Sequence, residues 1–401
     1  MRIIKAGLIL LICLSLCACG ARGQDSRNDD SGAESYFGDM LKTEVAGMEN
    51  EAASFAQMHW EKGMELSYAT TFFVEKAGDY VLITIADADR FLVVPEGQSV
   101  PDDVPKDVVI LKKPIQRAYL ASSSVFDLIR EAGALGRLRL SGTKKEDLCI
   151  QEAIAAMDAG ELLYAGKYNK PDYELLIAEG CDLAIENTMI YHNPEAKEKL
   201  EALGIPVLVE TSSYETHPFG RMEWIKLYGL LFDREDDADA FFDETVKAIM
   251  PVLQQEKTDC KVAFFYVNSN GVVNVRKPGD YVAKMISLAG GEYVLTDAKV
   301  EEENALSTMN MQMEDFYLAA KEADVIVYNS TIVGELNSIG DLLELSPLFA
   351  DFKAVKENRV YCTEKNFFQQ TTAIADFVED LGMALRNPEQ KEFHQMKKLL
   401  K

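Results

Sequence analysis

The feature that most constrains this chain is an alternation of short apolar strands with helices between residues 166 and 224. Residues 174–180 are typical of a helix that ends at a glycine, and residues 182–186 follow as a short apolar strand. Residues 194–203 predict a second helix with a proline in its first turn, and residues 204–209 predict the next buried strand. Apolar strands that alternate with helices indicate a parallel sheet covered on both faces, so the chain belongs to the α/β class.

Two polar loops, residues 187–193 and 211–220, follow these two strands. In open parallel sheets, ligands collect beyond the carboxyl ends of the strands. Both loops carry aromatic and imidazole side chains that a plain connection does not need, namely Tyr191, His192, Tyr214 and His217. We therefore interpret the two loops as the floor of a binding cleft.

The rest of the chain surrounds this stretch with further α/β elements. Residues 70–97 alternate between apolar and polar side chains across turn-forming breaks, which predicts an antiparallel meander. Residues 235–255 carry apolar side chains at three- and four-residue spacing, which predicts one long helix that Pro251 should bend or end early. A second series of strands and helices occupies residues 262–385, so we expect this helix to join two lobes.

The start of the chain predicts export and lipidation. Residues 1–5 are positively charged and residues 6–16 are apolar, a run too short to span a bilayer and typical of a secretory signal. Residues 16–20 resemble the lipobox of bacterial lipoproteins, which implies cleavage of residues 1–18 and a lipid on Cys19. Residues 19–65 then predict a flexible tether. We expect the protein to be lipid-anchored at the cell membrane and to face outside the cytoplasm.

Charge and cysteine usage exclude some partners. The formal net charge is −25, which argues against nucleic acid as a partner. Cys149, Cys181, Cys260 and Cys362 are widely spaced and form no C-x-x-C pair, so we expect free thiols.

The layout of the two halves resembles a known family. Residues 170–176 precede the strand 182–185, residues 311–317 precede the strand 324–327, and each stretch starts a helix that bears a glutamate. This arrangement resembles the substrate-binding lipoproteins of ABC importers for iron–siderophore, haem and cobalamin. Residues 117–124 look like the opening strand and loop of that family, and the glycine pair 290–291 falls where its members commonly have one.

The resemblance implies a fold and a domain order. The expected fold is α/β, with two Rossmann-like lobes joined by one long α-helix and a ligand cleft between the lobes. The expected boundaries are 66–234 for the N-terminal lobe, 235–256 for the linking helix and 257–401 for the C-terminal lobe.

The resemblance also implies a function and partners. A protein of this family captures an iron chelate, haem or a corrinoid and delivers it to a membrane permease and its ATPase, as a monomer without a covalent cofactor. One glutamate on each lobe meets the permease, and Glu174 and Glu314 match those positions. An exposed carboxylate at a helix start is stabilised there and can steer a basic partner, although such acids are also ordinary at helix starts.

The candidate ligand-binding residues share a polar or aromatic side chain in loops and helix starts that we expect to face the cleft. They are Ser123, Lys167, Tyr168, Tyr191, His192, Tyr214, His217, Arg221, Asn268, Arg276, Asn329 and Lys365. Aromatic faces with a few cations suit a bulky, flat or anionic chelate. Serines 122–124 can equally act as the N-cap of the helix that follows.

Several alternatives stay open from the sequence. His192 and His217, with Glu186 or Glu215, are candidate ligands of a bare divalent metal, and histidine or tyrosine is a candidate axial ligand of haem. A ligand sensor of the same fold is a further possibility. An enzyme is not expected, because the chain has no nucleophile elbow, no zinc-protease motif and no phosphate-binding loop.

Overall fold

The computed structural model of the protein describes residues 54–86, 89–298, 307–390 and 392–401. The expected signal peptide, the expected lipidation site Cys19 and most of the expected tether lie outside these ranges. Residues Ala52–Lys401 form one unit, to which all the elements below belong. Across the described ranges, every helix is too short or too polar to cross a bilayer.

The first five strands form a sheet of their own, which we call the N-terminal sheet. They are β1 (Glu61–Lys62), β2 (Phe72–Ala77), β3 (Tyr80–Ile85), β4 (Asp89–Val94) and β5 (Val108–Lys112), in this spatial order. The predicted antiparallel meander is confirmed for β2, β3 and β4, whereas β5 runs parallel to β4. Residues 54–65, which the sequence analysis placed in the tether, form a short helix, η1 (Phe55–Gln57), and the strand β1 paired with β2.

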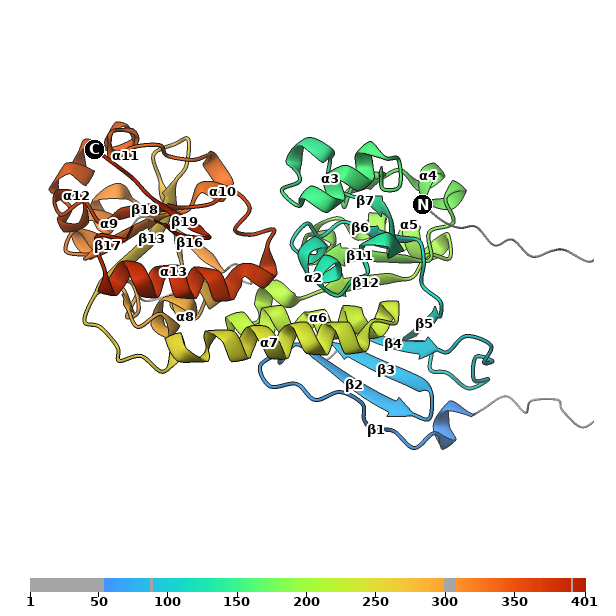
Figure 1. Cartoon of the computed structure of the whole chain (residues 1–401). Coiled ribbons are helices and arrows are strands. Elements are labelled where there is room, and N and C mark those ends of the chain that lie inside the picture. The colour runs from blue at the N-terminus through green and yellow to red at the C-terminus, as the bar shows by residue number, and fades with distance from the viewer. Residues whose placement is uncertain (1–53, 87–88, 299–306, 391) are drawn as a thin grey trace, which may run out of the picture. The chain divides into compact units, whose positions relative to one another are not determined.

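The N-terminal lobe, as we name it here, contains a parallel sheet of order β12-β11-β6-β7-β8 (Figure 1). Its strands are β6 (Ala118–Leu120), β7 (Leu138–Ser141), β8 (Leu163–Tyr164), β11 (Leu183–Asn187) and β12 (Val207–Glu210). Helices α2 (Val125–Glu131), α3 (Gln151–Asp158), α4 (Tyr173–Ala178) and α5 (Pro194–Ala202) connect them, and β9 (Gly166–Lys167) pairs with β10 (Lys170–Pro171) as a hairpin. The two loops of interest contain the short helices η4 (Thr188–His192) and η5 (Ser212–Tyr214).

Two long helices follow the strands of the N-terminal lobe, and the first of them is part of that lobe. Helix α6 (Pro218–Phe232) is almost wholly buried, and α7 (Glu235–Leu253) packs against it and continues to the second lobe (Figure 1). The two helices approach closely at Gly229, where an added Cβ would lie 2.6 Å from the Cβ of Ala238. Helix α7 ends shortly after Pro251, in agreement with the predicted early end.

The C-terminal lobe, our name for the rest of the chain, contains a mixed sheet of order β16-β14-β13-β17-β18-β19, with β15 (Glu292–Tyr293) paired to β13. The central strands β13 (Lys261–Val267), β17 (Val325–Tyr328) and β18 (Val360–Thr363) are parallel, and β14 (Val273–Arg276), β16 (Thr308–Met311) and β19 (Met396–Lys398) add antiparallel edges. The helices are α8 (Tyr281–Leu288), α9 (Met313–Ala320), α10 (Ser330–Val333), α11 (Ile339–Leu345), α12 (Lys353–Lys356) and α13 (Ile374–Arg386).

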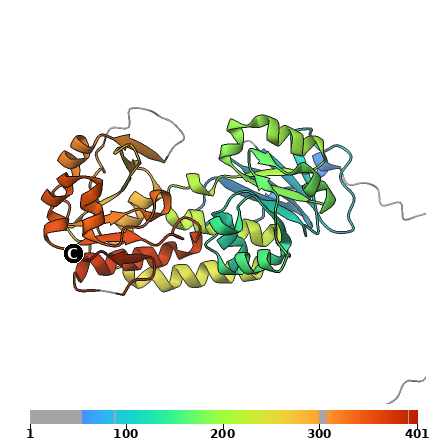
Figure 2. The same cartoon turned by 90° about the horizontal axis from the view of Figure 1, so that it is seen from above.

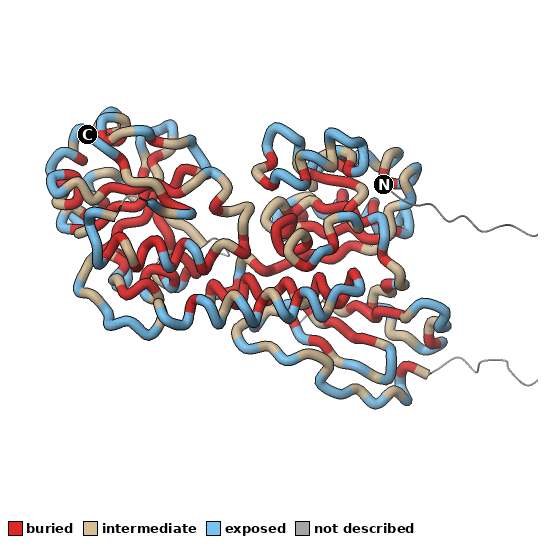
Figure 3. The backbone as a smooth tube through the Cα atoms, in the orientation of Figure 1, coloured by how far each residue is buried: buried red, intermediate tan, exposed pale blue. Residues whose placement is uncertain are grey.

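The two lobes keep separate sheets, which Figure 2 shows from above. The predicted fold class, two α/β lobes joined by a long helix, is therefore confirmed. Buried residues follow the strands of both lobes and the whole of α6 (Figure 3), and Trp224 is among the largest fully buried side chains. The four cysteines of the described ranges are free thiols, as predicted.

Candidate ligand-binding site

The residues between β18 and α13 hold the two lobes together. The side-chain oxygen of Gln369 accepts from the amide of Cys149 at 2.8 Å, and its amide nitrogen donates to the carbonyl of Asp147 at 2.7 Å. The Thr371 hydroxyl donates to the Ser124 carbonyl at 2.8 Å, and the Thr372 amide donates to Asp127 at 2.8 Å. These bonds fix the junction at which the carboxyl ends of β6 and β18 lie.

Two predicted arginines, one from each lobe, meet at this junction. The guanidinium of Arg221, in the first turns of α6, lies 4.4 Å from the ring centroid of Tyr281 at the start of α8. The guanidinium of Arg276, at the end of β14, lies 5.5 Å from the same ring and 4.7 Å from the ring of Phe368. We call these four residues the arginine–aromatic cluster. Cation–π contacts stabilise each guanidinium without consuming its hydrogen-bond donors.

The cluster has more positive than negative charge. Asp280 is its carboxylate: it pairs with Arg276 at 3.5 Å and accepts from the Val282 amide at 2.9 Å, which caps α8. Burial raises the pKa of Asp280, and the two arginines counteract that rise. Arg221 is only 5% exposed, and its Nε has no hydrogen-bond partner among the described residues. Two guanidiniums with one carboxylate can therefore accept a further anionic group.

His217 is the N-cap residue of α6, one turn before Arg221, and its geometry fixes its protonation state. Its Nδ1 accepts from the Phe219 amide at 3.2 Å, and its ring stacks on Tyr68 with centroids 4.7 Å apart. Burial, followed by the charge of Lys284, lowers the pKa of His217 to about 4. The imidazole is therefore neutral, with its proton on Nε2 because Nδ1 is an acceptor.

The four side chains proposed for a bare metal do not form a ligand set. His192 is exposed at the end of η4, whereas Glu215 accepts from the amides of Thr70 and Thr71 and so holds the N-terminal sheet. Glu186 is buried on β11, and burial raises its pKa to about 8, so that it is protonated at neutral pH. In the part of the chain that the structure describes, no group of three histidine, cysteine or acidic side chains is suited to a metal ion.

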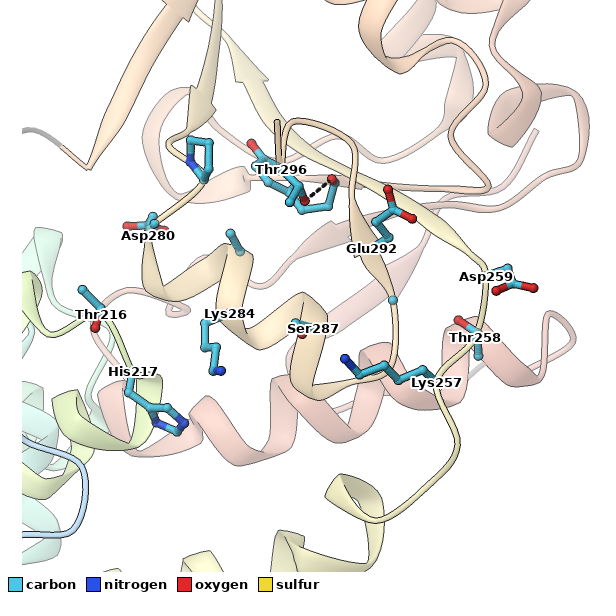
Figure 4. Close-up of a pocket in the computed structure, with 15 residues that line it drawn as sticks. Thr216, His217, Lys257, Thr258, Asp259, Asp280, Lys284, Ser287, Glu292 and Thr296 are labelled. Atoms are coloured by element: carbon cyan, nitrogen blue, oxygen red, sulfur yellow. Dashed lines mark hydrogen bonds between the residues drawn. The ribbon is translucent and has the colours of Figure 1, made fainter. Parts of the chain in front are cut away.

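A cavity of about 640 Å³ adjoins the cluster (Figure 4). Thr216 and His217, which follow β12, form one end, and residues 257–259, which precede β13, form the other. Asp280, Ala283, Lys284 and Ser287 line it from the start and the exposed side of α8, together with residues around β15. Asp280 is thus shared between this cavity and the arginine–aromatic cluster.

Several other predicted residues are engaged in local contacts. The Tyr214 hydroxyl lies 3.2 Å from the Thr188 hydroxyl, and Tyr191 donates to Asp89 of the N-terminal sheet at 3.2 Å. Burial, followed by the charge of Asp89, raises the pKa of Tyr191 to about 12. Lys365 forms an ion pair with Glu335 at 3.0 Å.

The two predicted asparagines close turns at strand ends. The Asn268 side chain accepts from the amides of Asn270 and Val272, and the Asn329 side chain accepts from the amide and hydroxyl of Thr331. Both carbonyl oxygens are therefore occupied by local bonds.

The serines at the start of α2 behave differently from the prediction. Ser124 occupies the N-cap position of α2, but its hydroxyl makes no capping bond, while the Ser122 hydroxyl donates to Glu210 at 2.7 Å. Ser123 is half-buried in the same turn. Lys167 is exposed and Tyr168 half-buried on the β9–β10 hairpin.

Of the twelve predicted ligand-binding residues, the structure brings Arg221 and Arg276 to one ring, that of Tyr281, and places His217 in the adjoining cavity. Sequence reasoning missed Tyr281 and Phe368, which complete the cluster, and Asp280, which pairs with Arg276. The four-residue spacing of Arg276 and Asp280 is the only local signal of their pairing. Glu174 and Glu314 are both exposed, each at the second position of its helix, α4 or α9.

A two-lobed α/β fold with a charged site at the lobe junction is the architecture of a solute-binding protein. The chain belongs to the family described as Periplasmic binding protein, whose model matches residues 143–366. This match confirms the suspected family, and it is a family of binding proteins rather than enzymes.

Curated relatives come from Methanocaldococcus jannaschii. Uncharacterized lipoprotein MJ0878 is 22% identical over 304 residues, which span 72% of this chain and 70% of the relative. Uncharacterized lipoprotein MJ0872 is 24% identical over 313 residues, which span 75% of this chain and 77% of the relative.

Solved structures share the fold at low sequence identity. The periplasmic haem-binding protein HutB of Vibrio cholerae has a TM-score of 0.54 at 17% identity, covering 66% of this chain and 98% of its own. An ABC-type Fe³⁺-hydroxamate transport protein of Saccharomonospora viridis has a TM-score of 0.53 at 21% identity, covering 68% and 93%. The molybdate-binding protein MolA of Haemophilus influenzae has a TM-score of 0.54 at 14% identity, covering 68% and 87%. Because these three bind different ligands, the shared fold does not select a ligand.

Proposed function

We propose that this protein is the extracytoplasmic substrate-binding lipoprotein of an ABC importer, anchored through Cys19, and that it captures a metal chelate for the membrane permease. The ligand class is an iron chelate (a siderophore or haem) or a cobalamin-like molecule. The arginine–aromatic cluster carries the proposal, because it brings one cation from each lobe against two aromatic rings of the C-terminal lobe at one junction. The haem- and hydroxamate-binding neighbours and the lipoprotein relatives support it.

The ligand is best identified by purification from the native host, followed by an absorption spectrum and metal analysis. Haem, corrinoid and ferric hydroxamate absorb at different visible wavelengths, so a coloured preparation names the class directly. A colourless, iron-free and cobalt-free preparation that also fails to bind these three compounds in titration would overturn the proposed ligand class.

The role of the cluster is tested by Arg276→Gln. Removing a buried charged hydrogen-bond donor should weaken binding of an anionic chelate by about tenfold or more. Arg90→Gln is the matched control, because Arg90 forms an ion pair with Asp107 in the N-terminal sheet, away from the junction. If Arg276→Gln and Arg90→Gln bound the ligand with equal affinity, the arginine–aromatic cluster would not be part of the binding site.

We also propose that Glu174 and Glu314 contact arginines of the permease. Exposed carboxylates at two helix starts, one in each lobe, are suited to a basic partner. The double variant Glu174→Ala/Glu314→Ala should abolish uptake of labelled ligand by cells while leaving ligand affinity unchanged. Glu198→Ala/Glu322→Ala, which alters two other exposed glutamates, should leave uptake intact. Full uptake by the first double variant would end the docking assignment.

A further inference from the structure

The far end of the cavity beside α8 lies at the amino end of β13, away from the carboxyl ends of the parallel strands in the C-terminal lobe. Residues 257–259, which form its far end, immediately precede β13, and Glu292 pairs with Lys261 at the start of that strand. Cleft ligands of parallel sheets bind instead beyond the carboxyl ends. With a volume of about 640 Å³, the cavity falls within the range of small-molecule sites.

One side of the cavity presents hydrogen-bond donors. Lys284 on α8 and Lys257 before β13 direct their ammonium groups into the cavity, with Ser287 between them (Figure 4). Neither ammonium has a hydrogen bond or an ion pair with another described residue. The neutral His217 adds a third donor on the same side, because its Nδ1 is occupied by the Phe219 amide and its proton is on Nε2.

The opposite side presents carboxylates. Glu292 and Asp259 lie together on the side of the cavity away from His217 and Lys284 (Figure 4). Asp280 does not count among the free charges, because it already pairs with Arg276 and caps α8. Two ammonium groups and two carboxylates are left uncommitted. They balance in number: Lys284 lies at the His217 end of the cavity, Glu292 and Asp259 lie at the other end, and the Lys257 side chain extends from that other end toward Lys284 (Figure 4).

From this arrangement we propose that the cavity is a second binding site, for a zwitterionic small molecule such as a free amino acid or a short peptide. The carboxylate of the ligand accepts from Lys284, Lys257 and the Nε2–H of His217, and its ammonium group pairs with Glu292 and Asp259. A simple dianion would place charge against the two carboxylates, and a simple dication would meet the two ammonium groups, so both are disfavoured. This proposal goes beyond the metal-chelate function proposed above, and the two sites touch at Asp280, which lines the cavity and pairs with Arg276.

A ligand bound in this way contacts both lobes. Thr216 and His217 belong to the N-terminal lobe, whereas α8 and β15 belong to the C-terminal lobe. Because the ligand binds only the folded chain, saturation with it should raise the melting temperature of the protein.

The test is calorimetric titration of the full chain, purified in detergent. The probes are the individual L-amino acids and trialanine, with succinate as the dianion and putrescine as the dication. At least one zwitterion should bind and raise the melting temperature, and it should bind at least tenfold more tightly than succinate or putrescine.

Two variants locate the binding. Lys284→Gln and Glu292→Gln should each lower the affinity for the zwitterion by about tenfold, since each removes one charged partner of the ligand. Both residues are exposed, so the fold should tolerate the changes, which thermal unfolding without ligand verifies. Lys247→Gln, on the exposed side of α7, is the matched control and should bind normally. The proposal is overturned if no zwitterion binds at millimolar concentration, if succinate or putrescine binds as tightly, or if both variants keep full affinity.

Discussion

The N-terminal and C-terminal lobes share an alternation of strands and helices, but different forces hold the layers around them. Beside the N-terminal lobe, two buried glutamates of the α6 region bind the N-terminal sheet through its backbone. Glu223 accepts from the amides of Ser67, Tyr68 and Ala69 at 2.7–2.8 Å, and Glu215 accepts from the amides of Thr70 and Thr71 and from the indole of Trp224.

The C-terminal lobe is packed by aromatic side chains instead. The ring of Phe265 on β13 lies 4.5 Å from that of Phe316, 5.8 Å from that of Tyr328 and 5.4 Å from that of Phe349. Such packing depends on volume and shape, whereas the carboxylate contacts depend on charge and direction. We therefore expect the stability of the C-terminal lobe to respond to truncation, and that of the N-terminal lobe to respond to charge and pH.

The largest expected effect is that of Phe265→Ala. Removal of a fully buried ring from this aromatic group leaves a cavity and should lower the free energy of unfolding by about 3–5 kcal/mol. Urea unfolding of the full chain measures this. Phe265→Leu removes less volume and is the control: it should lower the free energy of unfolding clearly less than Phe265→Ala does. If Phe265→Ala lowered the free energy of unfolding by less than Phe265→Leu does, the stability of this lobe would not depend on the volume of the buried side chain.

The next effect should depend on pH and concerns Glu186. The folded pKa of about 8 exceeds the ordinary value of 4.5, so the folded state holds a proton that the unfolded state loses. The contribution of Glu186 to stability therefore falls as pH rises from about 4.5 to about 8 and is constant above that window. Glu186→Gln, which cannot ionise, should remove this slope and be more stable than the natural protein at pH 9.

The measurement is the melting temperature of both forms between pH 5 and pH 9. Glu198→Gln, an exposed position, is the matched control and should keep the slope of the natural protein. An unchanged slope in Glu186→Gln would show that this carboxyl group does not titrate in the window.

The smallest of the three effects is that of Glu215→Gln. The amide keeps the shape of the side chain but loses the charge that attracts the amides of Thr70 and Thr71, so the free energy of unfolding should fall by about 1–3 kcal/mol. Hydrogen exchange should show the loss first in β2, which follows these residues. If amides of the C-terminal lobe lost as much protection from hydrogen exchange as those of β2, a local role for Glu215 would be contradicted.

Local patterns predicted much of the fold. The apolar runs of β11, β12, β13 and β17, and the glycines that follow α4 and α5 before β11 and β12, give the alternation without knowledge of any distant residue. The edge strand β16 was missed because Thr308–Met311 lacks a run of buried apolar residues, and its pairing with β14 crosses a long connection.

The candidate site was less predictable, because chemical type does not reveal whether a side chain is already occupied. Asn268 and Asn329 satisfy backbone amides of their own turns, Glu215 holds a sheet far from it in sequence, and Ser122 bonds Glu210. Each of these partners is supplied by the tertiary fold or by a turn whose geometry the sequence pattern does not specify.

The sequence by itself determined the α/β class, the order of the lobes and the helix between them, because strand and helix periodicity and helix stops are local properties. Only the tertiary structure decided that Arg221 and Arg276 share the ring of Tyr281, and that Lys257 and Lys284 face one cavity. These groups come from separate elements of the chain, and their approach depends on how α6, α8 and β14 pack.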